Sequence, residues 1–527
     1  MIHLGEAPRA EVEVVVARRF GGASTVTWLD RDELRRRPLP TLAWLLRQRY
    51  AAAVLVASDL RQPRLRLTSF VLGLARARRC WRLDLLGRGE AFGVGSHLAR
   101  NVLPIVRHLI ACGLALTLGE RVLRVIDRCI RPRVLRMARP TRVLYLRSQL
   151  WLGLEGGGSV AHTAGVVRGL EQAGVDVQVI SSDRLPGVAA PTAVTRPEVW
   201  FDGWLRELED LAFNAAFFGA ALRTIRRKPA GAIYQRHTTF NVSGALLSRV
   251  VRVPLVLEFN SSEVWKGRYW GGLHLVRAAM LVERINLCAA DRVVVVSRVL
   301  EEYVRSAGVP VERVLLNPNA VDPTQFRPDV DPSQVRQRLG LVSSVVIGFS
   351  GTFGKWHGIP TLAEALSRVC SARSNVRWLL IGDGPLGYLV DEAVRIHQLA
   401  ERVSRPGLVP HADMPAYLAA CDVLVSPHGR QADGGEFFGS PTKLYEYMAT
   451  GRPIVASSVG QIADVLEPER SALLVPPDDP EAFSRAILRL VDDACLRTRL
   501  GQAVRQAAVE RHTWRQNAER VLNSFGA

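Results

Sequence analysis

From Thr141 onward, short apolar runs alternate with longer amphipathic segments along the chain. An apolar run of four to eight residues between turn signals is typical of a buried strand, and the amphipathic segments are typical of helices. Strand–helix–strand alternation predicts parallel sheets with right-handed crossovers. The strands predicted in the first half of this region are 142–147, 175–181, 231–235, 254–259 and 292–297.

A second alternating series begins at Ser344, after the turn-rich segment 317–322 and three nearby prolines, which together indicate a linker. Parallel sheets bind ligands beyond the carboxyl ends of their strands, where glycine-rich loops occur in both halves. Two doubly wound domains would therefore face one ligand cleft. The strands predicted in the second half are 345–350, 376–381, 422–426, 453–456 and 472–475.

The first 95 residues also alternate, but they carry no phosphate-loop signature. The pattern indicates a small α/β domain of unassigned role. Its predicted strands are 11–18, 26–30, 51–58 and 81–86, with a helix over 66–79.

Residues 101–119 are mostly apolar, but Arg107 and His108 interrupt them. The uninterrupted run 109–119 is shorter than the about 20 residues that span a bilayer. An apolar helix followed by a polybasic helix fits an in-plane anchor on an anionic membrane face. The alternative is a helical hairpin packed on a neighbouring domain. The arginines that follow are Arg121, Arg124, Arg128, Arg131, Arg133, Arg136 and Arg139.

The net charge of +19 is concentrated at the N-terminus: residues 1–140 hold 26 arginines and 11 acidic residues. This asymmetry predicts an anionic partner for that segment. Aromatic residues do not interleave the arginines as nucleic-acid stacking requires. We therefore expect segment 96–140 to meet an anionic membrane surface, and no nucleic acid to bind.

The length of 527 residues predicts two or three domains. Seven scattered cysteines, without C-x-x-C spacing, give neither a zinc site nor a disulfide framework and favour a reducing compartment. The N-terminus lacks the pattern of a signal peptide. The expected location is the cytoplasm, peripheral on the inner face of the cell membrane.

The most chemically informative stretch is the glycine-rich, acidic loop 432–439 and the helix that follows it. Ser440 is a favoured N-cap, and Pro441 suits the first helical position. The amides from Thr442 onward would then form an anion site at the positive end of the helix, beside the ammonium of Lys443.

Glu446 follows Lys443 by three residues and lies on the same helical face. A lysine beside free amides, followed by a carboxylate, suits a ligand with phosphates and a diol. Lysine is otherwise rare in this chain, which uses arginine instead. A compact ammonium differs from a guanidinium in shape and hydration, so a tight phosphate site could require lysine. The four lysines are Lys228, Lys266, Lys355 and Lys443.

Four motifs, by their order and spacing, resemble those of the GT4-type retaining glycosyltransferases of the GT-B fold. The resemblance covers about residues 142–525 and leaves the first 140 outside. It implies an α/β fold of two doubly wound, Rossmann-like domains facing a cleft. The small N-terminal α/β domain and the helical extension precede this region and are predicted from the residue pattern alone. The motifs are Gly156-Gly157-Gly158-Ser159, Asn317 to Asp322, Ser350 to Lys355, and Pro441 to Pro453.

The N-terminal pattern and the resemblance together predict five segments along the chain. The small α/β domain is predicted over 1–95 and the helical extension over 96–140. The acceptor domain follows over 141–322, the nucleotide-sugar domain over 323–511 and the C-terminal helix over 512–527.

The resemblance also implies transfer of a sugar from a UDP- or GDP-linked donor, with retention and without a metal or other cofactor. Glu446 would hold the ribose hydroxyls, and Lys355 with the Ser440 helix start would hold the diphosphate. A leaving diphosphate gains charge, which cations and amides stabilise. The catalytic set is Lys355, Glu446 and Glu436, and the donor-binding set is Gly351, Gly382, Gly384, Ser440, Pro441, Thr442 and Lys443.

One departure concerns the family's first glutamate, eight residues before the second, where this chain has Phe438. Glu436, two residues earlier, is the candidate to replace it. The Asp329-Val330-Asp331 segment falls in the linker and is expected to be solvated rather than to bind a metal.

On the acceptor side, the expected ligand is a glycan or a lipid-linked sugar. The Ser-Pro-x-Lys variant resembles transferases that build bacterial envelope glycans on polyprenyl-diphosphate lipids. Alternatives are a sugar-nucleotide epimerase or phosphorylase of this fold and a non-catalytic nucleotide-sugar-binding scaffold. The acceptor-binding set is Gly157, Gly158, His162, His237, Glu258 and Asn260, although His162 could instead only hydrogen-bond the backbone.

Overall fold

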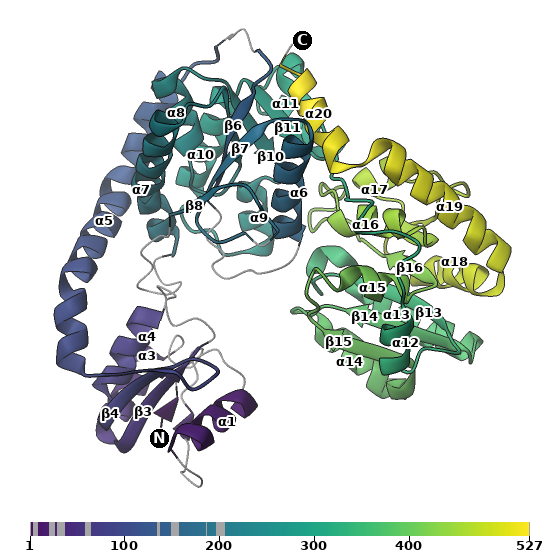
Figure 1. Cartoon of the computed structure of the whole chain (residues 1–527), viewed down its shortest axis with the longest axis horizontal. Coiled ribbons are helices and arrows are strands. Elements are labelled where there is room, and N and C mark those ends of the chain that lie inside the picture. Colours follow the sequence, from purple (N-terminus) through teal and green to yellow (C-terminus); the bar gives the residue numbers. More distant parts are fainter. Residues whose placement is uncertain are drawn as a thin grey trace. The chain divides into compact units, whose positions relative to one another are not determined.

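A computed structural model describes most of the chain, and its described residues form three sheets flanked by helices (Figure 1). The chain divides into two compact units, Met1–Val122 with Pro197–Ala216, and Leu123–Arg196 with Phe217–Ala527. The described residues are 2–3, 9–20, 27–28, 37–57, 65–133, 138–148, 158–185, 187–195 and 206–525.

The first unit contains a five-stranded sheet in the order β2-β1-β3-β4-β5, in which only β5 is antiparallel to its neighbour. Its core is aliphatic and lies on both faces of β3. The elements are β1 (Ile2–His3), α1 (Arg9–Phe20), β2 (Thr27–Trp28), α3 (Pro38–Arg47), β3 (Arg49–Val56), α4 (Leu65–Leu74), β4 (Arg76–Leu83) and β5 (Gly89–Phe92).

The predicted strand over 11–18 is wrong, because these residues lie in helix α1. Val12, Val15 and Val16 are buried, at the i, i+3 and i+4 spacing of one helical face. The predicted helix over 66–79 extends too far, since β4 begins at Arg76. The strand predicted over 51–58 is confirmed as β3.

Helix α5 (Val94–Cys129) is a single helix of 36 residues, so a helical hairpin within this segment is wrong. One side of α5 is buried: His108 Nε2 lies 3.0 Å from Glu209 Oε1 of α7 (Arg206–Arg227). Within the described part of the chain, no helix is both long and apolar enough to cross a membrane.

The second unit contains a seven-stranded parallel sheet in the order β12-β11-β10-β9-β6-β7-β8. The chain builds β6 to β8 outward and then crosses to β9, so the strand order reverses between β6 and β9. This reversal is where parallel sheets bind ligands. The strands are β6 (Arg142–Arg147), β7 (Asp176–Ser181), β8 (Thr192–Val194), β9 (Ala232–Arg236), β10 (Leu255–Phe259), β11 (Arg292–Val295) and β12 (Val314–Leu316).

The helices of this sheet include α9, which the sequence pattern did not predict. They are α6 (Gly158–Gln172), α7, α8 (Ser243–Val251), α9 (Glu263–Trp270), α10 (Val276–Ala289) and α11 (Arg298–Ser306).

A six-stranded parallel sheet follows in the same unit, in the order β15-β14-β13-β16-β17-β18, with its reversal between β13 and β16. The predicted strands 345–350 and 376–381 are confirmed at both ends. The strands are β13 (Val345–Ser350), β14 (Val376–Ile381), β15 (Val403–Gly407), β16 (Val423–Ser426), β17 (Ile454–Ser457) and β18 (Leu473–Val475).

The helices around this sheet cover both of its faces. They are α12 (Ser333–Arg338), α13 (Ile359–Ala372), α14 (Gly387–Ile396), α15 (Met414–Ala419), α16 (Thr442–Thr450), α17 (Gly460–Val465), α18 (Pro480–Asp492) and α19 (Ala494–Arg511), followed by α20 (Trp514–Asn523).

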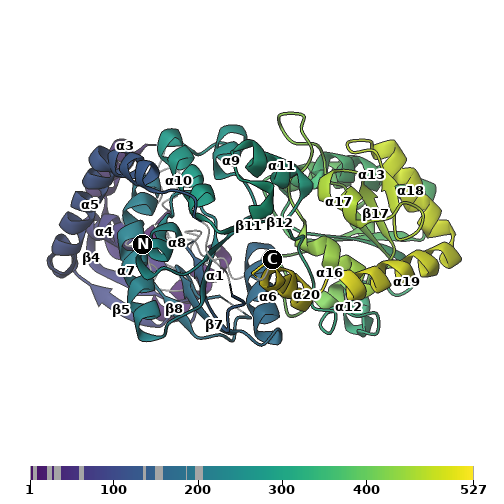
Figure 2. The same cartoon turned by 90° about the horizontal axis from the view of Figure 1, so that it is seen from above.

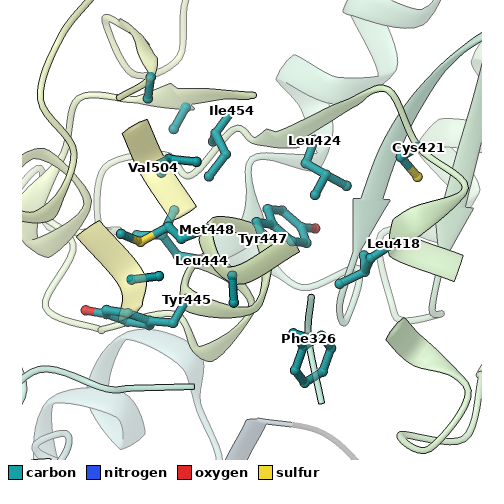
Figure 3. Packing of buried hydrophobic residues seen from close by; sticks show 14 of the residues in the cluster. Phe326, Leu418, Cys421, Leu424, Leu444, Tyr445, Tyr447, Met448, Ile454 and Val504 are labelled. Carbon is teal, nitrogen blue, oxygen red and sulfur yellow. The ribbon is translucent and has the colours of Figure 1, made fainter. Parts of the chain in front are cut away.

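Helix α16 is surrounded by core on almost all sides, as Figure 3 shows for Leu444, Tyr445, Tyr447 and Met448. Its residues are buried from Lys443 to Thr450. The charged side chains of this helix are therefore held in a largely apolar environment. Tyr447 Oη also accepts a 2.7 Å hydrogen bond from the amide of Ser350, which ties the end of β13 to α16.

Helix α20 returns to the seven-stranded sheet and lies beside α6 (Figure 2). Trp514 belongs to the core of that sheet. A Cβ placed on Gly165 of α6 would lie 2.1 Å from the Trp514 indole. The two helices approach this closely because α6 carries glycine where the indole lies.

We predict that Trp514→Ala destabilises the second unit by about 3–5 kcal/mol, the usual cost of truncating a buried tryptophan. Urea titration followed by circular dichroism measures the loss. Arg515→Ala, at a side chain that is 64% exposed, is the control and should change stability by no more than about 0.5 kcal/mol. Equal midpoints for the two variants would show that α20 is not an integral part of this core.

Candidate active site

Two glycine-containing loops meet at the carboxyl ends of β13 and β14. Gly351 (φ +139°) and Gly382 (φ +119°) adopt backbone conformations that side-chain-bearing residues rarely adopt. A Cβ on Gly382 would lie 2.1 Å from the carbonyl oxygen of Gly351, and one on Gly384 would lie 2.7 Å from the amide of Phe353. These glycines of the predicted donor set therefore let the two loops pack backbone against backbone.

The start of α16 differs from the prediction. Pro441 occupies the N-cap position, and no side chain caps the helix, so the predicted Ser440 cap is wrong. Ser440 Oγ instead lies 3.1 Å from the amide of Asn319 and 2.9 Å from Tyr445 Oη. The hydroxyl is used to hold the helix start in place, which leaves the first-turn amides uncapped by Ser440.

Lys443 is buried directly behind the Gly351 loop. Its Nζ lies 4.0 Å from the ring centroid of Phe349 and has no hydrogen-bond partner among the described residues. A Cβ on Gly351 would lie 3.1 Å from this Nζ. Burial lowers the pKa of Lys443 well below its ordinary value, and the nearby Glu446 carboxylate only partly opposes the shift. An unpaired buried amine is costly, so this site is suited to receive an anion.

Two histidines that the sequence reasoning missed lie beside Lys443. The rings of His357 and His428 are 5.1 Å apart and edge-to-face. Burial, followed by the charge of Lys443, lowers the pKa of both well below the ordinary value. His428 Nδ1 lies 3.0 Å from Ser426 Oγ, whereas its Nε2 has no partner among the described residues. The position of His428 just after strand β16 is the feature of the sequence that could have identified it as a site residue.

Glu446 lies one turn after Lys443 and is also buried. Its Oε1 is 3.3 Å from Nε2 of His411, which follows β15. The hydrogen bond to Glu446 raises the pKa of His411, and the carboxylate charge adds to that effect. The arrangement holds the Glu446 carboxylate in a fixed position beside Lys443.

The remaining candidates of the catalytic set are exposed. Lys355 is exposed, at the start of the short helix η2 (Lys355–His357). Glu436 is exposed and takes part in none of the hydrogen bonds or ion pairs found among the described residues. Phe438, at the position of the family's first glutamate, is partly buried against Trp265 and Trp270 of α9.

On the other sheet, the structure brings three predicted acceptor residues together at the end of β10. Glu258 Oε1 lies 2.7 Å from His162 Nε2, 2.9 Å from Arg236 Nη1 and 2.6 Å from Asn260 Nδ2. Burial raises the pKa of Glu258, but His162, Arg236 and Asn260 outweigh burial and lower it to about 2. The carboxylate is therefore ionised and fully engaged.

His162 also reaches the linker between the two sheets. Its Nδ1 lies 2.7 Å from Asn319 Oδ1, and Asn319 Nδ2 donates to the carbonyl of Ser440 at 2.5 Å. Asn319 Nδ2 also lies 3.4 Å from Thr442 Oγ1. A continuous hydrogen-bonded path therefore connects the Glu258 cluster with the start of α16.

The other acceptor candidates have different environments. A Cβ on Gly158, at the start of α6, would lie 3.5 Å from Thr442 Oγ1, so this glycine adjoins the start of α16. His237 is buried and its ring stacks on that of Phe259 at 4.9 Å. Its Nδ1 lies 3.4 Å from the side-chain nitrogen, Nδ2, of Asn286. Gly157 lies outside the described residues.

Two facing Rossmann-like sheets, glycine loops behind a buried lysine, and a carboxylate one turn later define a nucleotide-sugar-dependent transferase. Two family models match the chain: "Glycosyl transferase 4-like domain" over residues 157–320 and "Glycosyl transferases group 1" over residues 344–493. The chain belongs to the GT4-type glycosyltransferases of the GT-B fold.

Two curated relatives carry glycosyltransferase names. The 2-deoxystreptamine glucosyltransferase of Streptomyces kanamyceticus is 26% identical over 298 residues, covering 54% of this chain and 75% of that protein. The D-inositol 3-phosphate glycosyltransferase of Acidothermus cellulolyticus is 28% identical over 402 residues, covering 70% and 86%.

Among solved structures, the HepE protein of Anabaena in complex with UDP-glucose is similar in fold. Its TM-score is 0.58 at 20% identity, and the match covers 72% of this chain and 98% of that one.

We predict that Lys443→Met stabilises the ligand-free protein by about 1–3 kcal/mol, because it removes an unsatisfied buried amine. The same variant should lose the rise in thermal midpoint that UDP or GDP produces in the wild type. Differential scanning fluorimetry with and without nucleotide measures both effects.

Lys228→Met is the matched control for Lys443→Met, since the Lys228 side chain is 42% exposed and paired with Asp176. It should keep the nucleotide response. A nucleotide shift that persists in Lys443→Met would remove Lys443 from the donor site.

Proposed function

We propose that this enzyme is a retaining, metal-independent hexosyltransferase that transfers a sugar from a UDP- or GDP-linked donor to a glycan or lipid-linked acceptor in envelope polysaccharide synthesis. It acts in the cytoplasm, peripheral on the inner face of the cell membrane. The observation that carries the proposal is the unpartnered buried amine of Lys443 beside Gly351, with the carboxylate of Glu446 one turn further along α16.

On the donor side, a diphosphate would supply the anion that Lys443 lacks, and a charged partner restores its protonated form. The N-terminal end of α16 supports the same assignment, because helix N-termini favour phosphates. As the sugar leaves, negative charge accumulates on the diphosphate, and these fixed positive groups stabilise it without a metal ion. Lys355 and the Gly351, Gly382 and Gly384 loops would line the same phosphates. The HepE protein, which is similar in fold, is described as a complex with UDP-glucose, and this supports a nucleotide-sugar as the donor.

Glu446 would bind the ribose, because a carboxylate can accept hydrogen bonds from two neighbouring hydroxyls. His411 already holds one of its oxygens, so the carboxylate is preorganised. Glu436 is the remaining catalytic candidate, and its exposure leaves it free to move toward a bound donor sugar.

On the acceptor side, the relatives named above are named for 2-deoxystreptamine and D-inositol 3-phosphate, both hydroxylated six-membered rings. We propose that the acceptor of this enzyme also presents a hydroxylated ring at the reacting end. The Glu258 cluster at the end of β10 would orient it, with His237 contributing from behind.

Membrane contact is proposed for helix α5. At about 100° per residue, Leu103, Ile110 and Leu114 fall on one face, and Arg121 and Arg128 continue that face toward the C-terminal end. An apolar stretch followed by a basic stretch suits contact with the interface of an anionic bilayer. The exposed apolar residues of α5 are Leu103, Val106, Leu109, Ile110, Leu114, Leu116, Leu118, Val122 and Val125.

We predict that Glu446→Ala lowers kcat/KM for sugar transfer by at least ~100-fold, because the donor loses its ribose anchor. Release of UDP or GDP from a panel of nucleotide-sugars and acceptors measures turnover, and EDTA should leave the wild-type rate unchanged. Glu364→Ala, an exposed glutamate on α13, should behave as wild type. Nucleotide binding without turnover would favour a scaffold, and product formed without an acceptor would favour an epimerase.

We predict that the triple variant Leu103→Ser, Ile110→Ser and Leu114→Ser reduces binding to vesicles containing phosphatidylglycerol by at least ~10-fold, because three exposed apolar side chains that would insert into the bilayer are lost. Vesicle flotation of the full chain measures binding. The matched control changes three exposed apolar residues outside α5, Val342, Ile396 and Leu408, to serine and should leave binding unchanged. Equal flotation of the two triple variants would contradict the assignment.

A further inference from the structure

Four aromatic side chains from three separate segments meet in the second unit, and we call them the aromatic wall. Trp265 and Trp270 lie on α9, Trp356 on η2 and Phe438 in the loop before α16. Trp270 stacks on Trp356 at 4.8 Å and 23°, and Trp265 contacts Phe438 edge-on at 5.3 Å. Trp270 also lies 6.2 Å from Phe438, so it touches both sides of the wall.

The aromatic wall lies at the edge of a core, since Trp356 packs against the buried cluster of the six-stranded sheet. All four rings are only partly buried, and α9 contains no buried residue although it carries two tryptophans and a tyrosine. Burying a large aromatic side chain normally contributes substantially to folding. A cluster of aromatic side chains that stay partly exposed is typical of a ligand-binding surface.

The aromatic wall adjoins both halves of the candidate active site. Alpha-helix α9 begins three residues after Asn260 of the Glu258 cluster. On the other side, Trp356 contacts His357 at 5.4 Å, and His357 in turn contacts His428 beside Lys443. The wall therefore lies next to the groups assigned to acceptor and to donor.

Polar groups border the aromatic wall. Trp265 Nε1 donates to Asp433 Oδ2 at 2.7 Å, which fixes the indole. The Glu263 carboxylate is paired with Lys266 at 2.6 Å and accepts from Ser261 Oγ at 3.0 Å. A saturated six-membered polyol ring has an apolar C–H face and a rim of hydroxyls, which matches aromatic faces bordered by carboxylates. A hydrocarbon chain would instead desolvate these carboxylates without new hydrogen bonds.

We propose that the aromatic wall is a stacking subsite for a saturated six-membered polyol ring, a pyranose or a cyclitol, of the acceptor. This inference deepens the proposed function and rests on it, because the ring belongs to an acceptor only if the protein is a glycosyltransferase with the proposed activity. Trp270 is its central residue, because it contacts Trp265, Trp356 and Phe438. The Glu258 cluster supplies polar contacts, and the wall supplies the apolar face.

The test titrates the full chain, in the presence of UDP, with methyl α-D-glucopyranoside and separately with myo-inositol, the two arms that distinguish a pyranose from a cyclitol. Binding is followed by tryptophan fluorescence and by calorimetry. Trp270→Ala should weaken binding of the preferred probe at least tenfold, and Trp270→Phe should stay within threefold of wild type. Trp44→Ala, a 39% exposed tryptophan on α3, is the matched control.

Nucleotide affinity separates this subsite from the donor site and should change less than twofold in Trp270→Ala. Unchanged probe affinity in Trp270→Ala, or failure of both probes to bind wild type, would overturn the inference. A parallel loss of nucleotide and probe affinity would assign the wall to holding the two sheets together instead. If Trp270→Ala does not fold, Trp356→Leu carries the same comparison. Probe binding by a wild-type protein that binds neither UDP nor GDP would support the wall and overturn the proposed function.

Discussion

The side chain of Asn319 holds the active-site region together. Its side-chain oxygen lies 2.7 Å from His162 Nδ1 on α6, and its side-chain nitrogen donates to the carbonyl of Ser440 before α16, so one residue of the linker bonds to elements that flank both sheets. The Asn319 backbone amide adds a bond to Ser440 Oγ. All of these groups are buried, where each lost partner leaves an unsatisfied polar atom. The position of α16, and with it Lys443 and Glu446, depends on this residue.

The region divides its charges into a satisfied half and an unsatisfied half. Glu258 is surrounded by His162, Arg236 and Asn260, so its charge is balanced before any ligand arrives. Lys443 Nζ lies over the ring of Phe349 and has no hydrogen-bond partner among the described residues. The charge of the nearby Glu446 only partly opposes the effect of burial on the pKa of Lys443. Folding therefore balances the charge of Glu258 but leaves the buried amine of Lys443 without a hydrogen-bond partner among the described residues. Ligand affinity and protein stability are opposed at Lys443.

The long apolar runs of the second unit predicted their strands well, because a strand buried on both faces leaves little ambiguity. The Glu-Val-Glu-Val-Val-Val segment near the N-terminus did not, since it fits both an alternating strand and one face of α1. At the site, Lys443 and Glu446 were visible as neighbours on one helix. The pairing of His162 with Asn319, 157 residues away, and the meeting of α9 with Phe438 arise only from tertiary contacts.

The return of α20 to α6 has a consequence for biosynthesis. The face of α6 that carries Gly165 and Gly169 stays uncovered until the ribosome has made Trp514 and the residues after it. The seven-stranded sheet is translated before the six-stranded sheet, but its core is complete only when α20 has been made. A nascent chain stalled before α20 would thus expose this face of α6 to chaperones and proteases.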